Sequence, residues 1–206
     1  MIDARLLPIQ RALLRPIAQI LVRAEVRADS ISLAGFGLGL AAVATIAAGY
    51  ALAGLALILL NRLFDGLDGA VARIVGPTDR GAFLDVALDF VFYALVPLGF
   101  AIADPAANGL PAATLIASFV GTGSSFLAFA VIAAKQGRSA EDYPDKGIHY
   151  IGGLTEGFET IAVFALMCIL PGHFPVLAYG FAAACAVTTV LRWRCGWTAF
   201  KGSTTD

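Results

Sequence analysis

The chain has 206 residues, of which 59% are hydrophobic and only 14% are charged, and its mean hydropathy is +0.81. Soluble domains average roughly 45–50% apolar and about 25% charged residues, so the composition excludes an ordinary soluble globular protein. The 14 basic residues are balanced by 15 acidic ones, and without a basic excess nothing points to nucleic acid as a partner. The composition predicts an all-α polytopic membrane protein with one membrane domain over residues 1–206.

The first segment, residues 3–28, combines apolar residues with five arginines: Arg5, Arg11, Arg15, Arg23 and Arg27. It is too charged to cross a membrane, and its pattern predicts an amphipathic helix in the membrane interface, with guanidinium groups among the lipid phosphates. A plain N-terminal arm is the alternative. Because proline removes a backbone donor and disrupts helices, we expect Pro8 and Pro16 to divide this helix into shorter pieces.

Six apolar stretches follow, at residues 31–50, 52–72, 82–103, 110–134, 154–170 and 174–191. A membrane-spanning helix needs about 20 residues, so we expect six transmembrane helices within residues 31–191. The connections after the first, third and fifth stretches contain no Lys or Arg. Every basic residue except Arg62 lies in the N-terminal segment, the other two connections or the tail, residues 192–206. With six spans these residues share one side of the membrane, and the positive-inside rule makes that side cytoplasmic for both termini.

Four aspartates stand in otherwise apolar sequence: Asp65, Asp68, Asp85 and Asp89. A charged carboxylate costs about 2.5–3.5 kcal/mol at the centre of a membrane helix, so four of them require a compensating ligand. Each pair has the spacing of one helix face, and the short connection at residues 73–80 can fold the two helices antiparallel. The four carboxylates are therefore expected to meet just below the cytoplasmic surface. Oxygen ligands of this kind suit Mg²⁺ or Mn²⁺, with Ca²⁺ as an alternative.

Small residues surround the carboxylates. Gly66, Gly69 and Gly81 each cost about 1 kcal/mol of helix propensity relative to alanine, and with Ala72 they leave an open face for a bulky ligand. Arg73 and Arg80 lie at the rim, where they can meet phosphate oxygens. Together these features predict a phosphoryl-transfer site with space for a diphosphate.

The pattern resembles the signature of the CDP-alcohol phosphotransferase family. It reads Asp65-x2-Asp68-Gly69-x2-Ala72-Arg73, then seven residues, then Gly81-x3-Asp85-x3-Asp89. All eight signature residues are present, and the intervening loop is one residue shorter than is usual in the family.

The resemblance implies how these residues act. Asp65, Asp68 and Asp85 would ligate two divalent ions, and Asp89 would complete the metal site and act as general base on the acceptor hydroxyl. Gly69, Ala72, Arg73 and Gly81 would lie against the CDP moiety.

The resemblance also implies the reaction. Phospholipid synthesis in this family transfers a substituted phosphate group from a CDP-linked lipid or alcohol to an acceptor alcohol and releases CMP. Membrane burial favours CDP-diacylglycerol as the donor. We expect a homodimer in a bacterial cytoplasmic (inner) membrane, surrounded by membrane lipids, with the active site facing the cytoplasm.

The acceptor is less constrained by the sequence. Glu156 and Glu159 share a helix face and could bind hydroxyls or an amine, together with neighbouring threonines. The alternative is a helix N-terminus decorated with acids, which is favourable in itself. Arg138 and Lys146, in the preceding loop, are candidates for binding an acceptor phosphate.

Three other functions are compatible with parts of the pattern. A CDP-alcohol donor with a diacylglycerol acceptor is the alternative within the family. An ion transporter would use the intramembrane aspartates as its pathway, but it leaves the glycines and Arg73 unexplained. A non-catalytic lipid-binding protein leaves the whole acidic set unexplained.

Overall fold

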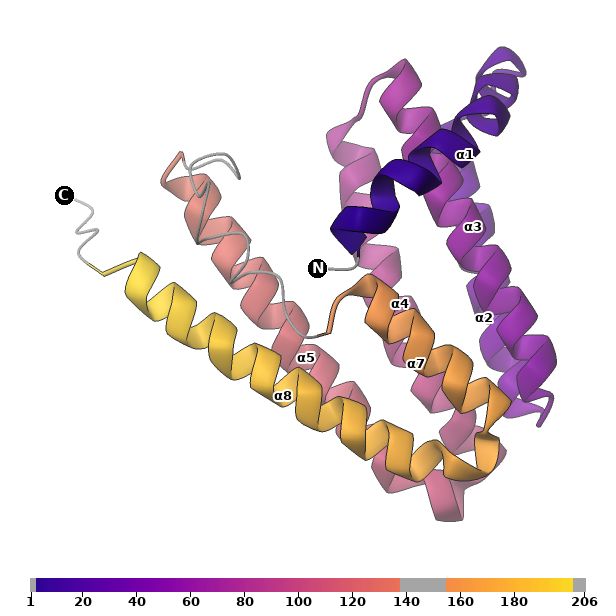
Figure 1. Ribbon diagram of the computed structural model, residues 1–206, viewed down its shortest axis with the longest axis vertical. Helices are drawn as coiled ribbons and strands as arrows, with labels where there is room; N and C mark the ends of the chain where they lie inside the picture. Colours follow the sequence, from indigo (N-terminus) through magenta and orange to yellow (C-terminus); the bar gives the residue numbers. More distant parts are fainter. Residues whose placement is uncertain (1–2, 138–154, 202–206) are drawn as a thin grey trace.

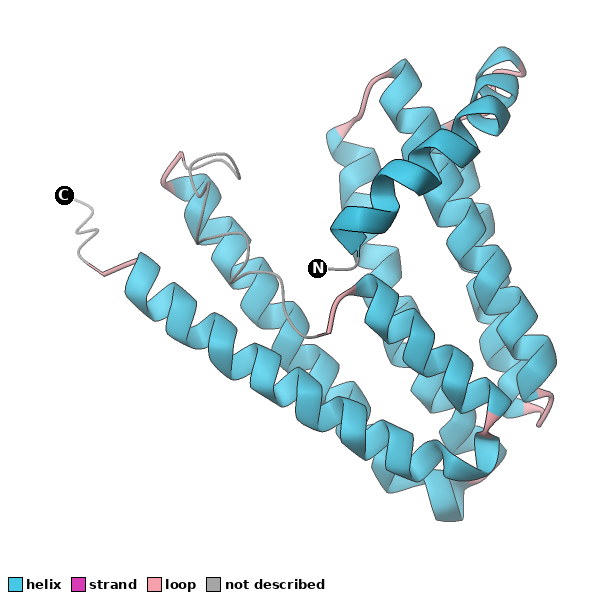
Figure 2. Ribbon diagram, in the orientation of Figure 1, coloured by secondary structure: helices cyan, strands magenta, loops and turns pink. Residues whose placement is uncertain are grey.

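Every element in the described part of the chain is a helix (Figure 2), in a computed structural model that describes residues 3–137 and 155–201. In chain order the elements are α1 (Asp3–Arg23), α2 (Ala28–Ala47), α3 (Ala51–Val75), α4 (Asp79–Ala103), α5 (Pro105–Lys135), α7 (Gly157–Ile169), the short 3-10 helix η2 (Pro171–His173) and α8 (Phe174–Ala199). The predicted all-α class is confirmed.

Four helical segments are long and apolar enough to cross a membrane: Ala28–Ala47, Asp79–Ala103, Pro105–Lys135 and Pro171–Ala199. The protein is therefore a polytopic membrane protein. α3 has 25 residues but carries four charged residues, Arg62, Asp65, Asp68 and Arg73. α7 has 13 residues. The count of six spans stays a prediction, because one of the expected spans is unusually charged and another is short.

The N-terminal helix differs from its predicted form. α1 is continuous from Asp3 to Arg23, so the prediction that Pro8 and Pro16 divide it is wrong. Proline fixes φ near the helical value, and the helix continues through both residues. The predicted extent to residue 28 is also wrong, because the chain leaves the helix at Arg23 and Glu25 adopts a positive φ of 58°.

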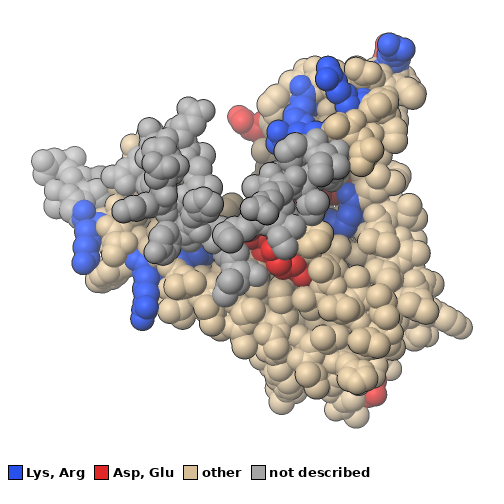
Figure 3. Space-filling model, viewed as in Figure 1, with Lys and Arg blue, Asp and Glu red and all other residues tan. Residues whose placement is uncertain are grey.

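α1 lies at the end of the molecule that carries the connection between α3 and α4 (Figure 1). Leu14 and Ala18 are buried in a cluster with residues of α2 and α3, whereas Leu13 and Ile20 are exposed. Basic side chains gather over α1 and over the C-terminal end of α8, and most of the remaining visible surface is uncharged (Figure 3). The position of α1 in the membrane interface stays a prediction.

α2 organises the two helices that carry the aspartates. α3 and α4 both pack against α2, rather than closely against each other. They are joined by a short turn in which Gly76 has a φ of 104°, a conformation that glycine adopts without a Cβ clash. Thr78 then caps α4, because its side chain accepts a hydrogen bond from the Gly81 amide at 3.1 Å. This turn sets the two aspartate pairs on antiparallel helices beside one another.

The main core lies farther from α1 and joins α2, α3, α4, α5, α7 and α8. The Phe100 and Phe174 rings stack with centroids 4.6 Å apart, and Phe92 meets Phe164 edge-on at 6.5 Å. In lipid, close packing of this kind replaces the hydrophobic effect as the force that associates helices. The core therefore anchors the helices while their opposite ends diverge (Figure 1).

A glycine in α2 makes the close approach to α4 possible. A Cβ at Gly39 would lie 2.8 Å from Phe92 Cδ2, whereas a Cβ at Gly37 would have no neighbour within 4 Å. We expect Gly39→Ala to lower the free energy of unfolding by about 1–3 kcal/mol, as overpacking does. Gly37→Ala is the matched control and should be neutral or slightly stabilising. Thermal unfolding of both variants in detergent tests this, and equal stability of the two would contradict it.

Candidate functional site

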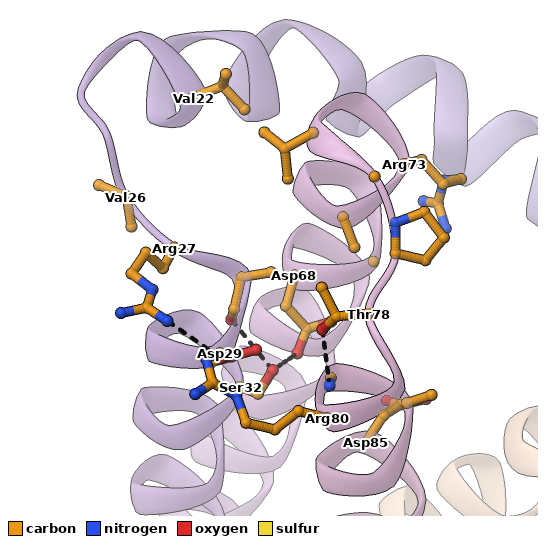
Figure 4. A pocket seen from close by; sticks show the side chains of 18 of the residues that line it. Val22, Val26, Arg27, Asp29, Ser32, Asp68, Arg73, Thr78, Arg80 and Asp85 are labelled. Carbon is orange, nitrogen blue, oxygen red and sulfur yellow. Dashed lines mark hydrogen bonds and ion pairs between the residues drawn. The ribbon is translucent and has the colours of Figure 1, made fainter.

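A cavity of about 680 Å³ lies between the end of α1, the first turns of α2 and α4, and the second half of α3 (Figure 4). Every residue predicted to contact CDP lines it, and so do three of the four aspartates. The predicted residues that it brings together are Asp65, Asp68, Gly69, Ala72, Arg73, Gly81 and Asp85. The sequence pattern therefore corresponds to one continuous space.

A smaller cavity of about 20 Å³ lies deeper, between α2, α3 and α4, and all four aspartates line it. A space of this size holds about one water-sized species. Asp89 reaches only this inner cavity, while Asp65, Asp68 and Asp85 line both. These three carboxylates therefore lie at the boundary between the large cavity and the inner one.

Asp68 is the most buried of the four aspartates, and a serine on α2 holds it. Asp68 is 7% exposed, and the Ser32 hydroxyl donates a hydrogen bond to Asp68 Oδ2 at 2.5 Å (Figure 4). A buried carboxylate requires such partners, because burial without them is costly. The contact fixes the direction of Asp68 and ties α3 to α2.

Asp89 is paired with Arg62, which crosses from α3 to α4. Arg62 Nη2 lies 2.7 Å from Asp89 Oδ1, and Nη1 donates to Asp89 Oδ2 at 3.3 Å. Arg62 Nη1 also lies 3.6 Å from Asp65 Oδ2. The Tyr93 hydroxyl donates to Asp89 Oδ2 at 3.3 Å. Both oxygens of Asp89 are thus engaged by protein groups.

Arg62 is itself held from several directions. Its Nε donates to Asn61 Oδ1 at 2.8 Å, and Asn61 Nδ2 donates to the Gly35 carbonyl at 2.8 Å. The guanidinium carbon lies 5.0 Å from the centroid of the Phe92 ring and 5.7 Å from that of Tyr93. These distances allow attraction between a cation and the face of an aromatic ring.

The predicted metal ligands that line the inner cavity are all carboxylates. Carboxylate oxygens suit a hard divalent cation. As placed, however, no three His, Cys, Asp or Glu side chains in the described part of the chain converge closely enough to hold a metal ion. Arg62 holds Asp89 and Ser32 holds Asp68. These two contacts explain why the carboxylates share a cavity without converging on one point.

The arginines at the rim have different surroundings. Arg80 forms an ion pair with Asp29 of α2, and Arg27 lies 3.9 Å from the same carboxylate. Arg73 lies on the other side of the cavity in Figure 4, and a Cβ at Gly69 would come within 3.1 Å of Arg73 Nη1. Gly69 therefore provides the space that the Arg73 guanidinium uses.

A separate cavity of about 230 Å³ lies between α4, α5, α7 and α8. Glu156 lines it together with Thr155 and Thr160, but Glu159 does not. Its basic residue is Arg192, whose Nη1 donates to the Thr122 carbonyl at 2.9 Å and which is electrostatically attracted to Glu156. Tyr93 also lines this cavity and connects it to Asp89. Arg138 and Lys146 lie outside the described residues.

Several of these residues were not predicted as part of the site. Arg62 was visible as the one basic residue within an expected span, but its partner was not. Arg192 was assigned to the tail, whereas α8 continues to Ala199 and carries it as a helical residue. Ser32 and Tyr93 have no distinguishing sequence pattern, because their roles depend on which helix faces them.

Comparisons with known proteins give one consistent family. A family model described as CDP-alcohol phosphatidyltransferase matches residues 26–193. The inner membrane protein YnjF of Escherichia coli K12 is 47% identical over 201 residues, which cover 98% of each chain. A phosphatidylcholine synthase of Brucella melitensis is 32% identical over 135 residues, which cover 62% of this chain and 42% of the synthase.

Solved structures agree with these sequence matches. The phosphatidylinositol phosphate synthase of Mycobacterium tuberculosis, in a structure with CDP-DAG bound, has a TM-score of 0.70 and is 24% identical, covering 95% of this chain and 98% of its own. A second structure of that protein, with manganese and citrate, also has a TM-score of 0.70 and is 25% identical, with coverage of 94% and 93%. The similarity in fold extends over nearly the whole length of both chains.

Asn61 provides a test of how the site is supported. Asn61→Leu removes the hydrogen bonds to the Gly35 carbonyl and to Arg62 Nε and leaves the Nε–H without this partner in a buried position. We expect the free energy of unfolding to fall by about 1–3 kcal/mol. Gln19→Leu changes an amide in the same way on the exposed surface of α1 and should have little effect. Chemical or thermal unfolding in detergent compares them, and an Asn61→Leu variant as stable as wild type would rule out the supporting role.

Proposed function

Because the chain belongs to the CDP-alcohol phosphatidyltransferase family, we propose that this membrane enzyme transfers a phosphatidyl group from CDP-diacylglycerol to an acceptor alcohol and releases CMP. The observation that carries the proposal is the cavity of about 680 Å³ that gathers the donor-binding residues and three of the aspartates. A transferase of this class belongs to phospholipid biosynthesis. Family membership also displaces the ion-transporter and lipid-binding alternatives.

The donor is proposed from the character of the large cavity. Arginines and aspartates line it near the end that carries α1, and apolar residues such as Val22, Val26 and Val75 line it as well. A nucleotide diphosphate linked to a lipid needs both kinds of surface. The relative crystallised with CDP-DAG bound supports the same choice. A soluble CDP-alcohol donor with a diacylglycerol acceptor is the alternative.

The reaction assigns separate tasks to the residues of the cavity. Arg73 is placed to bind phosphate oxygens of the donor, and Gly69, Ala72 and Gly81 leave room for the nucleotide. Asp65, Asp68 and Asp85 would hold the divalent cation, with Ser32 fixing the direction of Asp68. When bound, Mg²⁺ or Mn²⁺ would offset the charge of the diphosphate and of departing CMP; manganese in a structure of the M. tuberculosis relative supports such a site.

The chemical step requires one proton acceptor from the protein. The acceptor hydroxyl oxygen forms a bond to the phosphorus of the phosphatidyl group, the bond from that phosphorus to the CMP oxygen breaks, and the hydroxyl proton moves to an Asp89 carboxylate oxygen. Arg62 holds Asp89 beside Tyr93, and Tyr93 lines the cavity of about 230 Å³.

We place the acceptor in the cavity of about 230 Å³ that Tyr93 lines, because the Tyr93 hydroxyl connects this cavity to Asp89. Glu156 and Arg192 give it one acidic and one basic group, and three threonines give it hydroxyls: Thr122, Thr155 and Thr160. This set suits a polar acceptor with several hydroxyls or with an amine. Glu159 lies outside the cavity, so it is not part of this proposal.

The cellular setting belongs to the same proposal. The name of the E. coli relative, an inner membrane protein, supports the bacterial inner membrane. The distribution of basic residues supports cytoplasmic termini and a cytoplasmic active site. The homodimer rests on the family resemblance.

Release of CMP from CDP-diacylglycerol tests the reaction. With Mg²⁺ or Mn²⁺ and a mixture of alcohols, the purified wild-type protein should release CMP, and Asp85→Asn should lower kcat by roughly a hundredfold or more because a carboxylate is lost from the reacting site. Asp79→Asn is the matched control, since Asp79 lies in the first turn of α4 outside both cavities. Activity of Asp85→Asn equal to that of Asp79→Asn would refute the proposed site. Turnover of a CDP-alcohol with diacylglycerol would favour the alternative.

A panel of acceptor alcohols, with mass spectrometry of the lipid product, tests whether the cavity of about 230 Å³ binds the acceptor. We expect Glu156→Gln to raise KM for the acceptor by roughly tenfold or more, with little change in KM for CDP-diacylglycerol, because it removes a charge only from the acceptor side. Glu25→Gln removes a carboxylate at the opposite, donor side of the molecule and should leave KM for the acceptor unchanged. Equal effects of Glu156→Gln on both substrates would argue against the assignment.

A further inference from the structure

A further cavity of about 400 Å³, which we call the α1–α3 groove, lies between α1 and the C-terminal end of α3. Arg11, Arg15 and Gln19 line it from α1, and Arg73 lines both this groove and the large donor cavity. We propose that the groove binds a phosphate group, and that a phosphate bound there weakens binding of the anionic donor through Arg73. The effect on the donor rests on the proposed function.

The α1 side of the groove is a row of hydrogen-bond donors. Arg11, Arg15 and Gln19 follow one another at intervals of four residues, so they share one face of the helix. Leu14 and Ala18 lie on the adjacent face and are buried against α2 and α3, which fixes the rotation of α1. A guanidinium group can give a phosphate two parallel hydrogen bonds. The row therefore presents the groups that recognise a phosphate.

The two α1 arginines have no counter-ion from the protein. In the described part of the chain no acidic residue lines the groove, and neither Arg11 nor Arg15 forms a hydrogen bond or an ion pair. Arg80, by contrast, is paired with Asp29. Arg11 also repels Arg73 electrostatically. A phosphate group in the groove would replace this repulsion with attraction of both arginines to one anion.

The phosphate has two possible sources, a lipid headgroup and a soluble phosphate compound. Leu13, Ile17 and Ile20 are exposed on α1, which fits its predicted place in the membrane interface, where arginines attract anionic lipids. Ala70 and Ile74 add an apolar wall to the groove, which suits the part of a lipid next to its phosphate. A soluble phosphate offers the arginines the same oxygens.

Arg73 connects the groove to the donor cavity. Asp68, in the donor cavity, attracts Arg73, whereas Arg11, in the groove, repels it. Charges on both sides therefore act on this guanidinium. A phosphate in the groove adds negative charge beside Arg73 and so lowers its attraction for the donor diphosphate. By linkage, a nucleotide in the donor cavity must weaken phosphate binding in the groove by the same factor.

Binding to the purified full-length protein tests the groove with two probes. Native mass spectrometry measures dioleoylphosphatidylglycerol, and isothermal titration calorimetry measures inorganic phosphate. For at least one probe, Arg11→Gln and Arg15→Gln should each weaken binding by roughly fivefold, because each removes one cationic contact. Arg23→Gln removes the same charge from the exposed end of α1 outside the groove and should bind as wild type does. An effect on the lipid indicates a headgroup site, and an effect on phosphate alone indicates a soluble ligand.

Three results would overturn the inference: no binding of either probe by wild type, unchanged binding in both groove variants, or an equal loss in Arg23→Gln, which would indicate only general surface charge. The substituted arginines are exposed, so the variants should fold.

Addition of CDP tests the connection through Arg73. CDP should weaken binding of the probe to wild type by roughly fivefold, and an unchanged affinity would refute the connection. CMP release from CDP-diacylglycerol is measured separately. A protein that binds the probe through Arg11 but releases no CMP would contradict the proposed reaction and not the phosphate site, so the two failures are distinguishable.

Discussion

The structure depends on how charged carboxylates are compensated inside an apolar helix bundle. Each would be costly alone, and each is compensated differently. Ser32 of α2 donates to Asp68, and Arg62 of α3 pairs with Asp89 and lies 3.6 Å from Asp65. Asp85 lies at the edge of the large cavity. The compensating groups also set direction. A carboxylate that is held by Ser32 or Arg62 has one orientation rather than many, which is what a site for metal and phosphate requires.

The same contacts explain the arrangement of the helices. α3 and α4 lean on α2 instead of packing closely on each other, so the two aspartate faces stay separated by the two cavities. Arg62 bridges that separation, and Asn61 ties the bridge to the Gly35 carbonyl of α2. Beside Asn61, the absence of a side chain at Gly39 lets the Phe92 ring approach α2 closely. The site is therefore the place where α3 and α4 do not meet closely, and the packed aromatic core beyond it keeps the helices aligned.

The proposed donor and acceptor cavities are built differently. The motif residues that line the proposed donor cavity all come from one hairpin, α3–α4. The acceptor cavity is assembled from α4, α5, α7 and α8, and its charged pair, Glu156 and Arg192, lies 36 residues apart in the chain. The charged pair of the proposed acceptor cavity therefore lies outside the α3–α4 hairpin.

The sequence by itself determined the membrane class, the helical fold, the family and the aspartate hairpin, because helical spacing and a short turn leave little freedom over 25 residues. Only the tertiary structure decided what the aspartates touch. Ser32, Arg62 and Tyr93 acquire their roles from the rotation of three helices about their axes, and Arg192 from the extension of α8 past its apolar stretch. Local spacing predicts which residues share a face, whereas the partner of that face is set by packing between helices distant in sequence.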